Sequence, residues 1–272
     1  MSAYVYLLQC KNNSLYTGYT TNVTQRLKTH QEGKGAKYTK SHLPVLLAYC
    51  QLFPDKSCAL RQEARIKKFS RAKKLQICQN WSNETLRFAT GKDSKDILEI
   101  YQYYVENSIA TFAYTCPDLE EYRQWVEQSA LQYPFLVLER AGKIIGFAYA
   151  HRWREREAFD WAVETSIYLA PDVTGGERGV RLYGTLLALL REQGIYQAYA
   201  VLANPNPASE TMHQKIGFTQ LGSQPCCGWK HGQWQGNTLW GYCLREPNGE
   251  PAPVMPFCEL NQEKLTQLME HC

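Results

Sequence analysis

The chain has 272 residues, of which 44% are hydrophobic, 12% aromatic and 21% charged, and this composition excludes a disordered protein, a fibre and a repeat solenoid. Because a single core seldom grows past about 250 residues, the length predicts two domains. The net charge of +4 is unevenly divided: residues 1–92 carry 16 Lys and Arg against 4 Asp and Glu, and residues 93–272 carry 14 against 22. The first part is therefore suited to a polyanion, and the boundary is expected within residues 80–92.

The first part begins with a hairpin signal. β-rich runs at 4–10 and 15–19 flank a turn-forming segment that contains two asparagines. Thr20, Thr21 and Asn22 then offer N-cap residues for a helix. Arg26 and His30 lie four residues apart on this helix, so they share one of its faces.

A third strand and a second helix follow. Residues 45–53 are apolar and predict a strand, and Ser57 is expected to cap the helix after it. Glu63 and Lys67 stand four residues apart on that helix. The first part thus predicts a small β-β-α-β-α unit.

In this order, the residues resemble the GIY-YIG nuclease family over roughly residues 1–80, and most closely its small stand-alone bacterial members. The residues that carry the resemblance are Tyr4-Val-Tyr6, Tyr16-Thr-Gly18, Arg26, His30, Gly33 to Thr39, Glu63 and Ile66-Lys67. There are two departures from the family pattern. Tyr4 stands where the first motif begins with glycine, and the stretch 73–78 lacks the asparagine that some members use.

The resemblance implies a phosphodiesterase that uses one divalent ion, Mg²⁺ or Mn²⁺, bound by Glu63. Tyr6 or His30 would orient or deprotonate the attacking water, while Arg26 and Tyr16 would hold the reacting phosphate. DNA would bind the basic surface formed by Lys28, Lys34, Lys37, Lys40, Arg65, Lys67, Lys68, Arg71, Lys73 and Lys74. Taken singly, these features also fit a solvated helix face, a surface ion pair and tyrosines that pack in strands.

The second part predicts a mixed sheet with helices. The expected elements are helices at 97–105 and 119–133, strands at 135–138, 143–149 and 161–169, a helix after Gly179, a strand at 196–202, a helix at 208–216 and a hairpin at 228–240. The glycine-containing loop 175–179 lies between a strand and a helix. Such a loop favours phosphate binding, because free amide groups and the helix dipole both attract an anion.

This arrangement resembles the GCN5-related acetyltransferase (GNAT) superfamily over roughly residues 93–257, and more closely its phosphinothricin acetyltransferase-like branch. The closer resemblance is carried by Tyr103 to Asn107, Arg154-Glu-Arg156, Asp160 to Glu164, Pro205-Asn206, His213 and Gly228 to His231, with Trp234 and Trp240 in the late hairpin. Glu177 is a departure, because the branch usually has a glycine there. Its carboxylate would repel a pyrophosphate and weaken cofactor binding, unless it points outward and Arg178 offsets its charge.

The resemblance implies acetyl transfer from acetyl-CoA to a small primary amine, such as phosphinothricin or a methionine sulfone-like amino acid. Glu164 would take the proton of the amine, and His213 would protonate the departing thiolate. The backbone amides that would hold the pyrophosphate are those of Gly175, Gly176, Arg178, Gly179 and Val180. Asn206 would bind the cofactor or hold the adjacent chain. The amine substrate would contact Phe112, Arg154, Arg156 and Trp161.

Taken singly, these residues also have structural explanations. Glu164 fits a buried acid paired with an arginine, His213 a satisfied helix histidine, and the glycines ordinary turn residues. Cys226 and Cys227 fit small loop residues, since no metal ligands surround them in the sequence.

The chain is thus expected to be α/β, of the α+β type, with a GIY-YIG domain at 1–82, a linker at 83–92, a GNAT domain at 93–257 and a tail at 258–272. It would act as an acetyltransferase fused to a DNA-binding or nuclease unit, or as a DNA unit that delivers a modifying unit to a target. Alternatively, it is primarily a DNA endonuclease or DNA-binding protein with a degenerate acetyltransferase domain. No export signal or membrane-crossing run is visible, so a cytoplasmic protein without a membrane partner is expected. A homodimer is a further expectation from the acetyltransferase branch.

Overall fold

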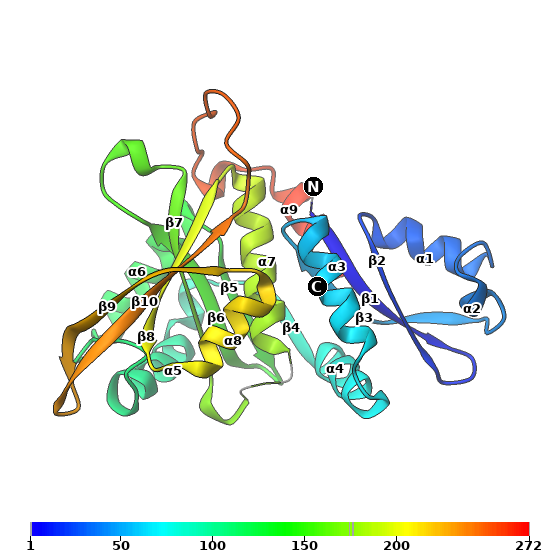
Figure 1. Cartoon of the computed structure of the whole chain (residues 1–272), viewed down its shortest axis with the longest axis horizontal. Helices are drawn as coiled ribbons and strands as arrows, with labels where there is room; N and C mark the ends of the chain where they lie inside the picture. The colour runs from blue at the N-terminus through cyan, green and yellow to red at the C-terminus, as the bar shows by residue number, and fades with distance from the viewer. Residues whose placement is uncertain (1, 174, 176, 272) are drawn as a thin grey trace.

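The computed structural model describes residues 2–173, 175 and 177–271. Its N-terminal part contains a three-stranded antiparallel sheet in the order β2-β1-β3 (Figure 1). The elements of this part are β1 (Ala3–Cys10), β2 (Leu15–Thr20), α1 (Val23–Gln31), α2 (Lys37–Lys40), β3 (Val45–Phe53), α3 (Lys56–Lys67) and α4 (Arg71–Asn83). The expected order is confirmed, with α2 and α4 as additions. Asn22 caps α1, but α3 begins earlier than expected, because Asp55 and not Ser57 caps it, accepting a hydrogen bond from Cys58 N at 2.7 Å.

The second part is built on a seven-stranded sheet in the order β4-β5-β6-β7-β8-β10-β9. The strands are β4 (Glu84–Phe88), β5 (Phe135–Arg140), β6 (Lys143–Arg152), β7 (Ala162–Leu169), β8 (Gln197–Asn204), β9 (Thr219–Lys230) and β10 (Gln233–Cys243). The helices are α5 (Ser94–Asn107), α6 (Leu119–Gln132), α7 (Arg178–Gln193) and α8 (Pro207–Ile216). β7 and β8 pair in parallel, whereas the other neighbouring strands pair antiparallel. The mixed α/β fold expected from the sequence is confirmed.

Alternating side chains of β5 cover the two faces of this sheet. Phe135 and Val137 belong to the apolar cluster that includes α5 and α6, whereas Leu136 and Leu138 belong to the cluster that includes α7. This alternation is what the two-residue repeat of a strand requires of a sheet covered by helices on both faces.

The segments expected as linker and tail are structured. Residues 84–88 form β4, which pairs with β5 at the edge of the large sheet. Asp93 closes a capping box with Thr90 in the turn that follows. Near the C-terminus, α9 (Gln262–Met269) lies against β1, where Tyr4 donates a hydrogen bond to Leu268 O at 3.1 Å. The segment predicted as a linker at 83–92 thus contains a strand of the large sheet and a capped turn.

Helix α7 lies between the two parts and is buried along most of its length (Figure 1). One apolar cluster joins Leu186 of α7 to Phe53 of the small sheet and to Leu136 of the large sheet. A Cβ at Gly184 would lie 3.2 Å from the Leu52 carbonyl oxygen, so α7 and β3 approach closely. The two parts thus share a core.

Candidate active sites

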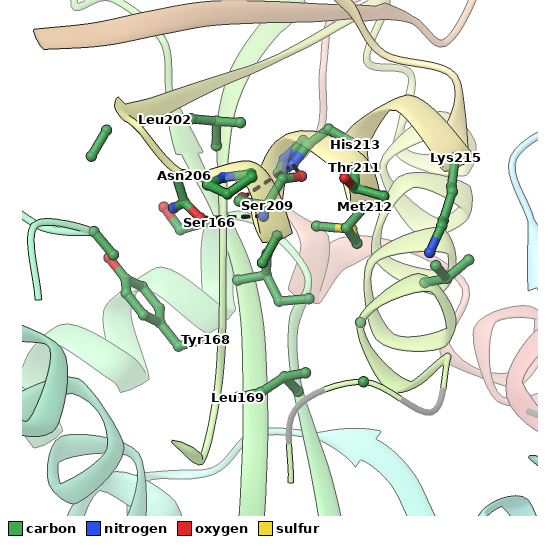
Figure 2. A pocket seen from close by; sticks show the side chains of 18 of the residues that line it. Ser166, Tyr168, Leu169, Leu202, Asn206, Ser209, Thr211, Met212, His213 and Lys215 are labelled. Carbon is green, nitrogen blue, oxygen red and sulfur yellow. Dashed lines mark hydrogen bonds between the residues drawn. The ribbon is translucent and has the colours of Figure 1, made fainter. Parts of the chain in front are cut away.

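A cavity opens where β7 and β8 separate. The two strands pair from Ala162 to Glu164, and Thr165 then donates a hydrogen bond to Tyr199 O at 2.8 Å. Beyond this point, residues 165–169 and 201–203 form opposite walls of a cavity of about 890 Å³ (Figure 2). This volume suits a ligand of the size of a cofactor.

The N-terminus of α7 also lines this cavity, through Gly175, Glu177, Gly179 and Val180. Gly179 and Val180 occupy the first turn of α7, whose amides have no acceptor within the helix. These amides and the positive end of the helix dipole give the cavity an anion-binding end. Among the other expected amides, that of Arg178 donates to Gly175 O at 3.3 Å, and Gly176 lies outside the described residues.

Glu177 has a left-handed backbone with φ of 67°, the conformation that glycine adopts without strain. Its carboxylate accepts a hydrogen bond from Arg65 Nη1 at 2.9 Å and a second one from Arg65 Nη2. The expectation that Arg178 offsets the charge of Glu177 is wrong, because Arg178 donates instead to Glu84 at 2.7 Å. The guanidinium that balances Glu177 comes from the N-terminal part of the chain.

Glu164 is the last residue of β7 that pairs with β8, and it lies opposite His151 in β6. The next residue, Thr165, begins the wall of the cavity. Burial raises the pKa of Glu164, and the nearby His151 opposes this effect. Glu164 itself is not among the described residues that line the cavity, but it directly precedes the wall, and a carboxylate with a raised pKa is suited to accept a proton.

His213 lies on α8 and lines the same cavity (Figure 2). Its Nδ1 lies 2.8 Å from Ser209 O, and its Nε2 lies 3.1 Å from the Tyr183 hydroxyl. Burial lowers the pKa of His213 to about 4, so the ring is neutral at pH 7. Its role as the acid stays a prediction, and this lowered pKa argues against a charged imidazolium as the donor.

Two neighbours complete the surroundings of His213. Tyr183 lies 2.6 Å from Thr165 Oγ1 and so connects His213 with the strand that carries Glu164. Tyr183 was not recognised from the sequence, because it stands within the apolar run of the α7 helix and belongs to no motif. Asn206 caps α8 by accepting a hydrogen bond from Ser209 N at 3.2 Å, so it holds the adjacent chain, as one of the two expected roles requires.

The four expected substrate residues do not line the described part of the cavity. Arg154 and Arg156 are exposed in the connection between β6 and β7, and Arg154 stacks on Trp153. Trp161 donates from Nε1 to Ala252 O at 2.8 Å. Phe112 packs against Gly228, because a Cβ added at Gly228 would lie 2.7 Å from the Phe112 ring. Their roles in substrate binding stay predictions.

A second cluster of polar side chains lies in the N-terminal part. The Tyr6 hydroxyl is 3.0 Å from His30 Nε2 and accepts a hydrogen bond from Arg26 Nε at 3.2 Å. The ring of Tyr16 is 5.3 Å from that of His30. A Cβ at Gly18 would lie 2.5 Å from the Tyr6 hydroxyl, so the motif needs glycine at this position. The structure thus brings together four of the five residues expected from the sequence.

The hydrogen bonds fix the tautomer of His30. Thr39 donates its hydroxyl proton to Ala36 O at 2.9 Å, so it accepts from His30 Nδ1 at 2.7 Å. Nε2 is then free to accept from Tyr6. Burial and Arg26 lower the pKa of His30, which keeps the ring neutral and able to receive the Tyr6 proton. Thr39, which sequence analysis missed as a positioning residue, gives His30 this orientation.

Glu63 is the fifth expected residue of this cluster. Its negative charge contributes to the raised pKa of Tyr6, for which burial is the larger cause. Its Oε1 lies 2.9 Å from the exposed ammonium of Lys67. Within the residues described, no group of three His, Cys, Asp or Glu side chains could hold a metal. A single carboxylate completed by waters and substrate phosphate still fits Mg²⁺, which retains several waters when it binds.

Comparisons with known proteins match both parts. Residues 2–76 match the GIY-YIG catalytic domain, and residues 86–239 match the acetyltransferase (GNAT) domain. The phosphinothricin N-acetyltransferase of Streptomyces viridochromogenes is 32% identical over 64% of this chain and 95% of the relative. A UPF0213 protein of Staphylococcus haemolyticus is 58% identical over 28% of this chain and 93% of the relative.

Among solved structures, a phosphinothricin acetyltransferase of Sinorhizobium meliloti in complex with acetyl-CoA is similar to the second part. It has 31% identity and a TM-score of 0.60, over 64% of this chain and 98% of that chain. The chain therefore belongs to the GNAT acetyltransferase family. It carries a GIY-YIG domain in front of the acetyltransferase domain. No helix within the described residues is long and apolar enough to span a membrane.

Proposed function

We propose that the second part transfers an acetyl group from acetyl-CoA to the primary amine of a small amino acid of the phosphinothricin or methionine sulfone type. The observation that carries this proposal is the cavity between β7 and β8, which is lined by Thr165, the residue after Glu164, and by Gly179 and Val180 at the start of α7. The similarity to a phosphinothricin N-acetyltransferase supports the substrate class, and the similarity to a phosphinothricin acetyltransferase solved in complex with acetyl-CoA supports the cofactor.

In this proposal, the walls of the cavity bind the elongated pantetheine arm, and the amides of Gly179 and Val180 bind the pyrophosphate. Glu164 takes a proton from the incoming ammonium, so that the neutral amine becomes the nucleophile. The amine nitrogen bonds to the acetyl carbon, the carbon–sulfur bond breaks, the nitrogen releases a second proton, and the thiolate takes up one proton. Because His213 is neutral near pH 7, the thiolate takes this proton from solvent, and His213 and Tyr183 hold the fork between β7 and β8.

Thiol release from acetyl-CoA tests this proposal with phosphinothricin, methionine sulfone and methionine sulfoximine as acceptors. Stimulation by at least one acceptor supports the substrate class. CoA binding without stimulation by any of them would reject these acceptors while retaining the cofactor. A lack of CoA binding would favour the alternative of a degenerate acetyltransferase domain.

We propose, as a second function, that the N-terminal part binds DNA and cleaves its backbone. The convergence of Tyr6, Arg26 and His30 supports cleavage in particular, since a basic surface alone would serve binding. Neutral His30 accepts the Tyr6 proton while Tyr6 activates water, and Arg26 balances the charge of the phosphate. Glu63 would hold the divalent ion, which when bound would stabilise the leaving oxygen.

Nicking of supercoiled plasmid with Mg²⁺ or Mn²⁺ at low salt tests this second function. Glu63→Gln should abolish nicking while DNA binding by filter retention remains within about twofold. Glu32→Gln, at an exposed carboxylate that follows α1, is a matched control for the lost negative charge and should leave nicking unchanged. An intact plasmid with the unaltered chain would reject cleavage, and nicking that survives Glu63→Gln would reject this metal ligand.

A further inference from the structure

Two residues from the N-terminal part line the cavity of the acetyltransferase part. Lys73 and Gln76 of α4 lie three residues apart, which is one turn of the helix, and both border the cavity together with Gly175, Glu177 and Gly179. α4 lies outside residues 86–239, the part of this chain that matches the acetyltransferase domain, and both residues fall within the GIY-YIG match at 2–76. The wall of the cavity near the start of α7 is therefore built from both parts.

Several contacts fix α3 and α4 at this wall. Arg61 and Cys58 of α3 both donate to Ile216 O at the end of α8, each at 3.0 Å. Ser70 caps α4 by accepting from Lys73 N at 3.3 Å. The Lys73 ammonium lies 4.0 Å from the centre of the Phe69 ring, which places this cation over an apolar base.

The charges that line the cavity near the start of α7 favour an anionic ligand there. Within the described lining residues, Lys73 and Lys215 are the lysines and Glu177 is the single carboxylate. The negative charge of Glu177 is already balanced by Arg65, which donates two hydrogen bonds to its carboxylate. Lys73 forms no ion pair among the described residues, so its charge is available to a ligand.

We propose that Lys73 binds a phosphate of CoA and that the N-terminal part thereby completes the cofactor site, an inference that rests on the proposed acetyl-CoA reaction. The ligand chemistry is a phosphate group at the nucleotide end of the cofactor, either the ribose 3′-phosphate or the pyrophosphate. A hydrogen bond between an ammonium and a phosphate is about twice as strong as a neutral one. Arg65 assists by holding the carboxylate of Glu177 in an ion pair.

Calorimetric titration with CoA, 3′-dephospho-CoA and pantetheine tests this inference on the full chain. Lys73→Ala should weaken CoA binding about tenfold, which corresponds to about 1.4 kcal/mol, and leave pantetheine binding unchanged. Lys74→Ala is the matched control, because Lys74 is the next residue of α4 and its ammonium donates to Lys67 O. It should change CoA binding by less than about twofold. An unchanged thermal unfolding midpoint of Lys73→Ala shows that the fold is intact.

The dephosphorylated ligand identifies the phosphate. If Lys73→Ala does not change the affinity for 3′-dephospho-CoA, Lys73 binds the ribose 3′-phosphate. If Lys73→Ala still weakens the binding of 3′-dephospho-CoA, Lys73 binds the pyrophosphate. Equal CoA affinity in Lys73→Ala and the unaltered chain would overturn the inference, as would an equal loss in Lys74→Ala. Failure of the unaltered chain to bind CoA would overturn the proposed function together with this inference.

Discussion

Arg65 and Glu177 form an ion pair that joins the two parts of the chain, with Arg65 Nη1 2.9 Å from Glu177 Oε1. Arg65 lies on α3, the helix that also carries Glu63, and Glu177 immediately precedes α7. The Glu177 side chain is only 7% exposed, and that of Arg65 is 22% exposed. The residue that departs from the glycine pattern of the acetyltransferase branch is thus a site of contact between the domains.

Loss of Arg65 should destabilise the chain and weaken CoA binding together. Arg65→Ala leaves a nearly buried carboxylate without its partner, which costs about 3 kcal/mol in the free energy of unfolding. The unbalanced carboxylate also faces the phosphates of the cofactor, so CoA affinity should fall about tenfold. Urea denaturation and calorimetric titration measure the two effects.

The double variant Arg65→Ala/Glu177→Gly separates the ion pair from other effects of Arg65. Glycine removes the unpaired charge and suits the left-handed backbone, which for other residues costs about 1–2 kcal/mol. The double variant should regain most of the lost stability and CoA affinity. Arg71→Ala, an exposed change on α4, serves as the control. Additive losses in the double variant would show that Arg65 does not act through Glu177.

Sequence patterns were sufficient for the elements whose apolar residues repeat regularly. The α5 and α6 helices lie where the sequence placed them, because each has a strong local pattern. The hairpin predicted at 228–240 is longer than expected, since β9 already begins at Thr219 and β10 ends at Cys243. β4 was missed, since a five-residue strand owes its conformation to pairing with β5, about 50 residues later. The Arg65–Glu177 pair spans 112 positions and has no local signal.

The same distinction applies to the candidate sites. The spacing of Arg26 and His30 predicted their shared face. The structure shows that the hydroxyl of Tyr6, which was also expected in this site, forms hydrogen bonds with both. Thr39 and Tyr183 were missed, because a hydroxyl that orients a histidine is recognised only once the tertiary contact is known. For the acetyltransferase site, the sequence indicated Glu164 and the glycine loop, and the structure adds a cavity lined by this loop and by Thr165, the residue after Glu164.

Replacement of Glu164 should affect turnover and spare cofactor binding. Glu164→Gln cannot accept the ammonium proton, so kcat should fall about 10²- to 10⁴-fold, while CoA affinity stays within about twofold. In the unaltered chain, kcat should rise with pH through a pKa above that of an ordinary glutamate, because burial raises the pKa of Glu164. Steady-state kinetics across pH 4 to 9 measures both.

Glu157→Gln is the matched control for Glu164, because Glu157 is exposed in the connection between β6 and β7. It should retain full activity. A parallel loss of kcat and CoA affinity in Glu164→Gln would contradict the assignment of Glu164 as the base.

His213 should make the chain less stable in acid. Its pKa is about 4 in the folded state and about 6.5 when unfolded, so the unfolded chain binds more protons between these values. The free energy of unfolding should therefore fall as the pH is lowered from about 6.5 to 4, by up to about 3 kcal/mol from this group. Urea denaturation at several pH values should show a shallower fall for His213→Gln. Equal slopes in the two proteins would contradict a neutral buried ring.

The shared core predicts that a change in the first part weakens the second. Phe53 is fully buried in β3 beside α7, and Phe53→Ala should lower the free energy of unfolding by about 3–5 kcal/mol. Six of the seven tryptophans lie at position 125 or later, and only Trp81 lies on α4, so tryptophan fluorescence reports mainly on the second part. The midpoint of the fluorescence transition should shift to lower urea.

Leu46→Ala tests the same strand at a position that is 63% exposed, and it should leave the midpoint nearly unchanged. A tryptophan midpoint that does not respond to Phe53→Ala would show that the two parts unfold independently.

The most direct test of the account is calorimetric titration of the unaltered chain with acetyl-CoA, followed by thiol release when phosphinothricin or methionine sulfone is added. The cavity between β7 and β8 predicts one binding site per chain and acceptor-dependent thiol release that Glu164→Gln abolishes. Titration without measurable heat, together with thiol release that no acceptor stimulates, would contradict the claim that this chain is a working acetyltransferase.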